Sequence, residues 1–128
     1  MDHIKYLGID WGEKRIGLAI AESELRLALP FKTVANFHEL LEVIAEEEIT
    51  EMVIGQPLKM KDSSLPLSSR FSDFLELLKN NSAVPVILLD ERLSSKAADA
   101  LPGNKNEKHG RDEVAAMLIL QDYLDKIA

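Results

Sequence analysis

Three carboxylates, Asp10, Glu91 and Asp112, are the residues of this 128-residue chain that are best suited to chemistry. Asp10 directly follows one apolar run, Glu91 comes just after another, and Asp112 precedes a final amphipathic segment. A hard cation such as Mg²⁺ binds one or two carboxylates together with water and phosphate. Two such ions about 4 Å apart can activate a water molecule and stabilise a leaving oxygen. The three acids would supply such a site if they converged at one sheet edge, which their spacing does not establish.

Each acid also has an ordinary structural interpretation. Asp10 stands two residues before Gly12, where an aspartate commonly starts a turn. Glu91 follows Asp90, and both acids would favour the N-terminus of the next helix. Asp112 fits the N-cap of the last helix. These alternatives stay open for each acid taken alone, whereas the three together favour a shared site.

Basic residues flank the same three places in the sequence. They are Lys14 and Arg15 after Asp10, Lys59 and Lys61 in the segment 56–66, and Lys105, Lys108, His109 and Arg111 before Asp112. Such an arrangement could hold a phosphate backbone beside bound metal ions. Lysines on solvated loops explain the pattern equally well.

The elements that must position these residues follow from hydrophobic periodicity. Alternation and short apolar runs predict strands at 3–9, 15–21, 25–31, 52–55 and 84–89. Helical spacing predicts helices at 37–48, 67–79, 92–100 and 112–127, with loops at 56–66 and 102–110. Asn36, with Glu39 three residues later, predicts a capped start for the first helix.

This order of elements predicts an α/β fold. A hairpin meander followed by alternating strands and helices indicates a mixed sheet with helices on its faces, in a single domain over 1–128. Ligands in such folds gather beyond the carboxyl ends of the strands. Two of the acids are predicted at those ends.

Composition excludes several classes of protein. The absence of cysteine rules out disulfides, thiolate nucleophiles and cysteine-based zinc sites. A net charge of −7 argues against a broad basic surface for nucleic acid, although a local basic patch remains compatible. No apolar run is long enough to cross a bilayer, and the N-terminus lacks a signal-peptide pattern, so we expect a cytoplasmic protein without membrane contact.

Four ordered motifs resemble those of one known family. Residues 10–19, DWGEKRIGLA, resemble the Asp-x-Gly-x-x-Arg-x-Gly-x-Ala opening of YqgF proteins, also called RuvX-like Holliday junction resolvases. The segments GQPLKM at 55–60, DERLSS at 90–95 and DEVAA at 112–116 are similar to later motifs of that family. The segment ILQDYL at 119–124 resembles the rest of its closing helix. The resemblance therefore runs along essentially the whole chain.

The resemblance implies a ribonuclease H-like fold and metal-dependent hydrolysis of phosphodiester bonds with Mg²⁺ or Mn²⁺. Its implied partner is precursor 16S ribosomal RNA, which the family is linked to trimming, or branched DNA. By position, Asp10, Glu91 and Asp112 become the catalytic metal ligands. The residues implied to support the site or hold the nucleic-acid backbone are Arg15, Arg92, Ser94 and Ser95.

Some features depart from the family pattern and leave rival functions open. No glycine follows Met60, Ser94 and Ser95 replace two threonines, and the loop before Asp112 is short. These differences bear on the choice of substrate. The rivals are a non-catalytic RNA-binding module for ribosome assembly and a nucleotide-binding domain of the actin-like or sugar-kinase type. The sequence also leaves open a monomer or a homodimer, and DNA or RNA as substrate.

Overall fold

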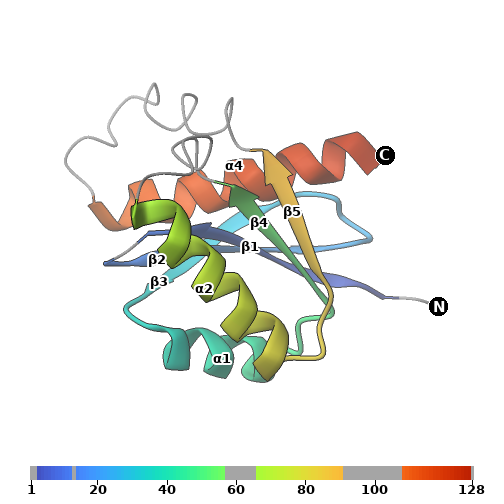
Figure 1. The fold of residues 1–128 in the computed structure, drawn as a ribbon. Coiled ribbons are helices and arrows are strands. Elements are labelled where there is room, and N and C mark those ends of the chain that lie inside the picture. The colour runs from blue at the N-terminus through green and yellow to red at the C-terminus, as the bar shows by residue number, and fades with distance from the viewer. Residues whose placement is uncertain (1–2, 13, 57–65, 91–107, 128) are drawn as a thin grey trace.

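The computed structural model describes residues 3–12, 14–56, 66–90 and 108–127 (Figure 1). Its elements are β1 (Lys5–Trp11), β2 (Ile16–Glu22), β3 (Leu29–Val34), α1 (Phe37–Glu46), β4 (Glu51–Gln56), α2 (Pro66–Asn81), β5 (Val86–Asp90) and α4 (Lys108–Ile127). Among these described elements, no helix is long and apolar enough to cross a membrane.

The strands form one mixed sheet in the order β3-β2-β1-β4-β5. The pairs β1–β2 and β2–β3 are antiparallel, whereas β1–β4 and β4–β5 are parallel. Helix α4 covers one face of the sheet, and α1 and α2 cover the other (Figure 1). The predicted α/β fold with helices on both faces of a mixed sheet is confirmed.

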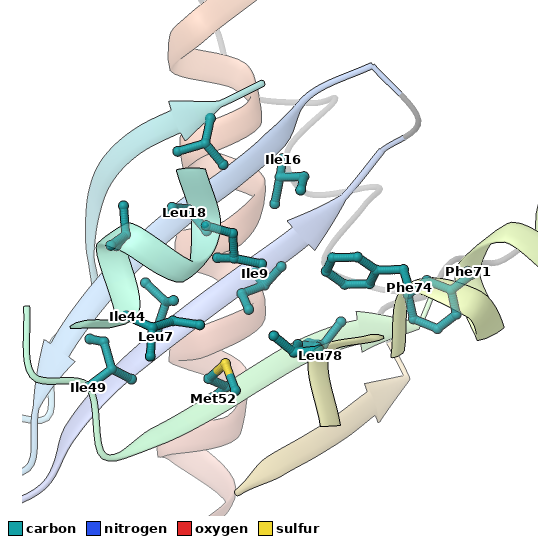
Figure 2. Close-up of a cluster of buried hydrophobic side chains, with 14 residues drawn as sticks. Leu7, Ile9, Ile16, Leu18, Ile44, Ile49, Met52, Phe71, Phe74 and Leu78 are labelled. Carbon is teal, nitrogen blue, oxygen red and sulfur yellow. The ribbon is translucent and has the colours of Figure 1, made fainter. Parts of the chain in front are cut away.

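Side chains that alternate along each strand build two separate cores. In β1, Leu7 and Ile9 belong to the larger core, between the sheet and helices α1 and α2 (Figure 2). Tyr6 belongs to the second core, against α4. Because both faces of β1 are buried, this strand is held rigidly at the centre of the sheet.

The α4 face of the sheet includes several small residues. Ala19 and Ala21 of β2 are buried there, together with Ala116 of α4. At Gly8 of β1, an added Cβ would lie only 2.7 Å from the Cβ of Leu120. The absence of larger side chains therefore lets α4 lie close to the strands.

Strand β1 extends farther than the predicted strand 3–9. Its ladder with β2 continues to the pair Trp11↔Ile16, so Asp10 lies inside the strand instead of directly after it. The short connection between the two strands leaves the backbone groups on either side free to pair with each other. The prediction that Asp10 directly follows the strand was therefore wrong, and so was the alternative in which it starts the turn.

Strand β3 begins at Leu29, later than the predicted start at residue 25. The segment before it is held by Gln121 of α4, whose Oε1 accepts from the Ala28 N–H at 2.8 Å and whose Nε2 donates to the Arg26 carbonyl at 3.2 Å. Arg26 also has a positive φ of 53°, which is incompatible with a strand. Leu25 is 72% exposed, so it is not a core residue.

Helix α4 begins at Lys108, a full turn before the predicted start at Asp112. Residues 108–110 are therefore helical, although the prediction placed them in a loop, and Asp112 is not an N-cap. Gly110 lies in the first turn, where backbone N–H groups have no intrahelical partner to lose. Its cost of about 1 kcal/mol relative to alanine is small beside the packing of α4 on the sheet.

The other elements agree with the predictions to within a few residues. Helix α1 ends at Glu46, two residues before the predicted end, and α2 spans the predicted helix 67–79. Strand β4 includes Gln56, which had been assigned to the following loop. Pro66, the last residue of that predicted loop, begins α2, whereas residues 57–65 and the predicted helix 92–100 lie outside the described residues.

The N-terminus of α1 gives a stability test of the capping prediction. Asn36 Oδ1 accepts from the Glu39 N–H at 2.9 Å, and Glu39 Oε1 accepts from the Ala35 N–H at 2.8 Å. We expect Asn36→Ala to lower the free energy of unfolding by about 1 kcal/mol, because it leaves a helix N–H without a protein acceptor. Urea unfolding measures the change, with Asn36→Asp as the control that keeps the acceptor. Equal losses in both variants would contradict the capping role.

Candidate metal centre

Asp10 is directed toward α4 by the strand that carries it. Side chains alternate along β1, and Tyr6 and Gly8 contact α4, so Asp10 shares their face. Its neighbour Trp11 points to the opposite face, where its ring lies 5.4 Å from that of Phe71 in an edge-to-face contact. This aromatic contact fixes the end of β1 and therefore the direction of the carboxylate.

Asp112 reaches the same place from α4. Its backbone lies directly against Gly17 of β2, where an added Cβ would be 2.1 Å from the Asp112 carbonyl oxygen. Gly17 is also the residue paired with Asp10 in the sheet. The two predicted ligands, which are distant in the sequence, are therefore both adjacent to one glycine.

The two carboxylates affect each other electrostatically. Burial and, next, repulsion from Asp112 raise the pKa of Asp10 from 3.8 to about 7, and the positive charge of Arg111 opposes this rise. A carboxyl group with such a pKa holds a proton through much of the neutral range. A bound cation would offset the repulsion between the two carboxylates and favour the ionised form of Asp10.

Asp112 has a cationic neighbour, but within the described part of the chain its Oδ2 atom has no donor with good geometry. The Nε atom of Arg15 lies 3.0 Å from Asp112 Oδ2, so the two charges attract. Yet none of the described residues donates a well-directed hydrogen bond to this buried oxygen. The short distance and the missing hydrogen bond are compatible, because an ion pair needs only proximity whereas a hydrogen bond needs alignment. A buried, under-coordinated carboxylate oxygen fits a divalent cation.

The backbone brings a third strand to the same edge. Ile9 pairs with Ile54 of β4, and farther along that strand Gln56 pairs with Asp90 of β5. The carboxyl ends of these three parallel strands therefore lie side by side, and the chain leaves β5 there just before Glu91. Glu91 itself lies outside the described residues, among which no group of three potential metal ligands occurs.

The other predicted site residues divide into two sets. Arg15 and Arg111 act on the two carboxylates, and Lys14 is exposed beside them in sequence. Lys108 is in the first turn of α4. The remaining candidates lie outside the described residues: Lys59, Lys61, Arg92, Ser94, Ser95 and Lys105.

Sequence reasoning missed the part played by Gly17. The available signal was a glycine within the apolar strand segment around Ile16 and Leu18, because a glycine inside a strand often marks a close backbone approach. It also missed that Arg15 contacts a carboxylate and treated it only as support for the site or the nucleic acid. That pairing depends on where α4 lies, which the sequence does not reveal.

The Arg15–Asp112 contact leads to a test of how firmly the site is held. The two side chains are 43% and 25% exposed, so we expect Arg15→Gln to lower the free energy of unfolding by no more than about 1 kcal/mol in metal-free buffer. The loss should shrink as salt is added. Lys126→Gln, which removes a more exposed ion pair with Asp122 on α4, is the control. A salt-independent loss of several kcal/mol would contradict this interpretation.

The strand order, the flanking helices and the acidic edge define a ribonuclease H-like α/β domain. The solved structure of T. thermophilus RuvC in complex with Holliday junction substrate matches with a TM-score of 0.61 at 15% identity, over 97% of this chain and 95% of that one. The fowlpox virus resolvase in complex with Holliday junction DNA matches with a TM-score of 0.60 at 11% identity, over 97% and 99% of the two chains. At these identities the likeness shows the fold alone.

The chain belongs to the family described as "RuvX: Holliday junction resolvase", which matches residues 4–126. A relative from Chloroflexus aggregans is 35% identical over 98% of this chain and 96% of its own length, and is named "Putative pre-16S rRNA nuclease". A relative from Chlamydia trachomatis serovar L2 has the same name and is 37% identical, over 94% of this chain and 90% of its own. The family resemblance seen in the four sequence motifs is confirmed.

Proposed function

We propose that this protein is a metal-dependent nuclease that hydrolyses phosphodiester bonds at a site formed by Asp10, Asp112 and Glu91. The observation that carries the proposal is the approach of Asp10 and Asp112 to each other at the edge where β1, β4 and β5 end. The two neighbouring carboxylates repel each other, and a divalent cation bound by both would offset more of this repulsion than Arg15 and Arg111 do. Membership of the resolvase family supports the same conclusion.

The chain's own residues have distinct roles in this proposal. When bound, Mg²⁺ or Mn²⁺ supplies Lewis-acid stabilisation of the phosphate and lowers the pKa of a water molecule. Asp10 and Asp112 would hold the cation through carboxylate oxygens, with Glu91 as the third acid. Asp10 must lose its proton first, because its pKa in the metal-free protein is about 7. Proton and cation therefore compete for the same carboxylate.

The basic residues beside the site would neutralise the substrate. Arg111 lies close enough to Asp10 to lower its pKa, and Arg15 contacts Asp112. Once a cation binds the carboxylates, the guanidinium of Arg15 would be free to contact a phosphate instead. Lys14 is exposed next to Arg15 and would extend the same basic border. These contacts position a backbone but carry no information about its sequence.

Precursor 16S ribosomal RNA is the substrate we propose, because the relatives that match nearly the whole chain are named for it. This activity would place the protein in the cytoplasm, as a monomer or a homodimer. A four-way DNA junction is the second candidate, since the family description names it. A resolvase cuts two strands symmetrically and would require the homodimer.

The two substrates can be compared in one experiment. Labelled precursor 16S RNA and a labelled four-way junction are incubated with the protein in Mg²⁺, in Mn²⁺ and in EDTA, and Asp10→Asn serves as the inactive control. Metal-dependent cutting of the RNA alone would support the proposed substrate, and cutting of the junction alone would overturn it. Binding without cutting in any metal would favour the non-catalytic RNA-binding alternative.

A further inference from the structure

Of the described residues Gly8, Gly12 and Gly17, Gly17 of β2 leaves the least room for a side chain. A Cβ added there would be 2.1 Å from the carbonyl oxygen of Asp112, 2.5 Å from its carbonyl carbon and 3.0 Å from its Cβ. All three contacts are with a single residue, and two of them are with backbone atoms that cannot rotate away. A side chain at this position would therefore require the start of α4 to move.

We propose that Gly17 is a positioning residue of the metal centre: its missing side chain sets where Asp112 lies relative to Asp10. This inference rests on the proposed function, because it assigns a role toward the same two carboxylates. Gly17 is adjacent to both: it pairs with Asp10 in the β1–β2 ladder, and it lies against the backbone of Asp112. It has no side chain with which to bind a cation or a substrate, so it would act only through Asp112.

Neighbouring contacts hold the same turn of α4. Arg15, two residues before Gly17, reaches the Asp112 carboxylate at 3.0 Å. Thr33, which pairs with Gly17 from β3, donates a long 3.4 Å hydrogen bond to Glu113. Strands β2 and β3, together with Arg15 just before β2, therefore contribute to the placement of residues 112–113, and at Gly17 there is no room for a side chain.

The size of the displacement allows an estimate of its effect. An alanine Cβ needs at least 3.0 Å from other heavy atoms, so the Asp112 carbonyl would have to move by about 1 Å. Metal ligands are sensitive to such shifts, and loss of a group that orients a ligand typically lowers affinity about 10–100-fold. We expect Gly17→Ala to weaken Mn²⁺ binding within that range.

Gly8 of β1 provides a matched control. It lies under the same helix, where an added Cβ would be 2.7 Å from the Cβ of Leu120 and 2.8 Å from the Ala116 carbonyl oxygen. Those contacts are one to two turns beyond Asp112 along α4. Gly8→Ala therefore also disturbs the packing of α4, but away from the carboxylates.

The experiment titrates Mn²⁺ into wild type, Gly17→Ala, Gly8→Ala and Asp10→Asn by calorimetry and records hydrogen exchange along α4. Both alanine variants should lose stability, but only Gly17→Ala and Asp10→Asn should lose Mn²⁺ affinity. Exchange should quicken around residues 110–114 in Gly17→Ala and around 116–120 in Gly8→Ala. If an alanine variant is unfolded in buffer, all four proteins are compared in an osmolyte that favours the compact state.

Two outcomes would overturn the role of Gly17. One is wild-type affinity for Mn²⁺ in Gly17→Ala when Asp10→Asn has lost it. The other is an equal loss of affinity in both alanine variants, which would mean that any disturbance of α4 has this effect. Unchanged binding in Asp10→Asn would instead contradict the proposed metal centre. In that case hydrogen exchange still tests whether Gly17 sets the position of Asp112. Unaltered protection of residues 110–114 in Gly17→Ala would overturn that role.

Discussion

Asp10→Asn is expected to lower the rate of phosphodiester cleavage by at least about 10³-fold while the protein stays folded. Removing a carboxylate that holds the cation withdraws several kcal/mol of stabilisation from the transition state, and each 1.4 kcal/mol is about tenfold in rate. The fold should survive, because the amide has almost the same shape and the uncharged side chain no longer faces repulsion from Asp112. Single-turnover cleavage of labelled RNA measures the rate.

The control for this experiment is a second aspartate on a described element. Asp122→Asn removes an exposed carboxylate of α4 that pairs with Lys126 at 3.4 Å, and it should cleave as fast as wild type. Asp112→Asn should behave like Asp10→Asn. Wild-type cleavage by Asp10→Asn, after repurification excludes a contaminating nuclease, would show that the chemistry takes place elsewhere.

The metal-free protein is expected to lose stability as the pH rises from about 4 to about 7. Burial and the nearby Asp112 raise the pKa of Asp10 from 3.8 in the unfolded chain to about 7 in the folded one. The folded state therefore binds more protons than the unfolded state between these two values. The stabilisation from protonated Asp10 is complete below about pH 4 and is lost by about pH 7. After allowance for partial solvation, we expect a change of about 1–2 kcal/mol.

The comparison with Asp10→Asn isolates this contribution. Other carboxylates titrate in both proteins, so the difference between their stability curves reports Asp10 together with its repulsion from Asp112. The variant should be the more stable of the two above pH 7 in EDTA, and urea unfolding at several pH values measures the difference. Saturating Mn²⁺ should reverse the order, because a ligand that binds only the folded state stabilises it. A difference curve without slope between pH 4 and 7 would contradict the shifted pKa.

The fold could be predicted from the sequence because the alternation of apolar residues in the strands and their helical spacing in the helices are both strong. The alternation of Ile16, Leu18 and Ile20 indicates a strand whose alternate residues face one core, and Leu40, Val43 and Ile44 mark the buried side of α1. The ends of elements were less predictable, since they depend on partners that are distant in the sequence. The late start of β3 follows from Gln121 of α4, and the end of β1 follows from its ladder with β2.

The candidate site could be predicted as a list of residues but not as a geometry. Asp10 and Asp112 were singled out by their positions and by family motifs, and the structure brings them together. Their approach depends on the antiparallel register of β1 and β2 and on how closely α4 lies on β2. Local sequence does not reveal the distance between α4 and β2, because that distance results from the contact of Gly17 on β2 with the backbone of Asp112 on α4.

The most direct test of the metal centre is the anomalous scattering of Mn²⁺ in crystals of the wild-type protein. A peak within coordinating distance of both the Asp10 and the Asp112 carboxylates is the predicted result, and we expect Glu91 to complete the ligand set. The same peak should be absent from crystals of Asp10→Asn grown under the same conditions. The account would be contradicted if the protein required Mn²⁺ for cleavage but its crystals showed Mn²⁺ bound only at a site away from these two carboxylates.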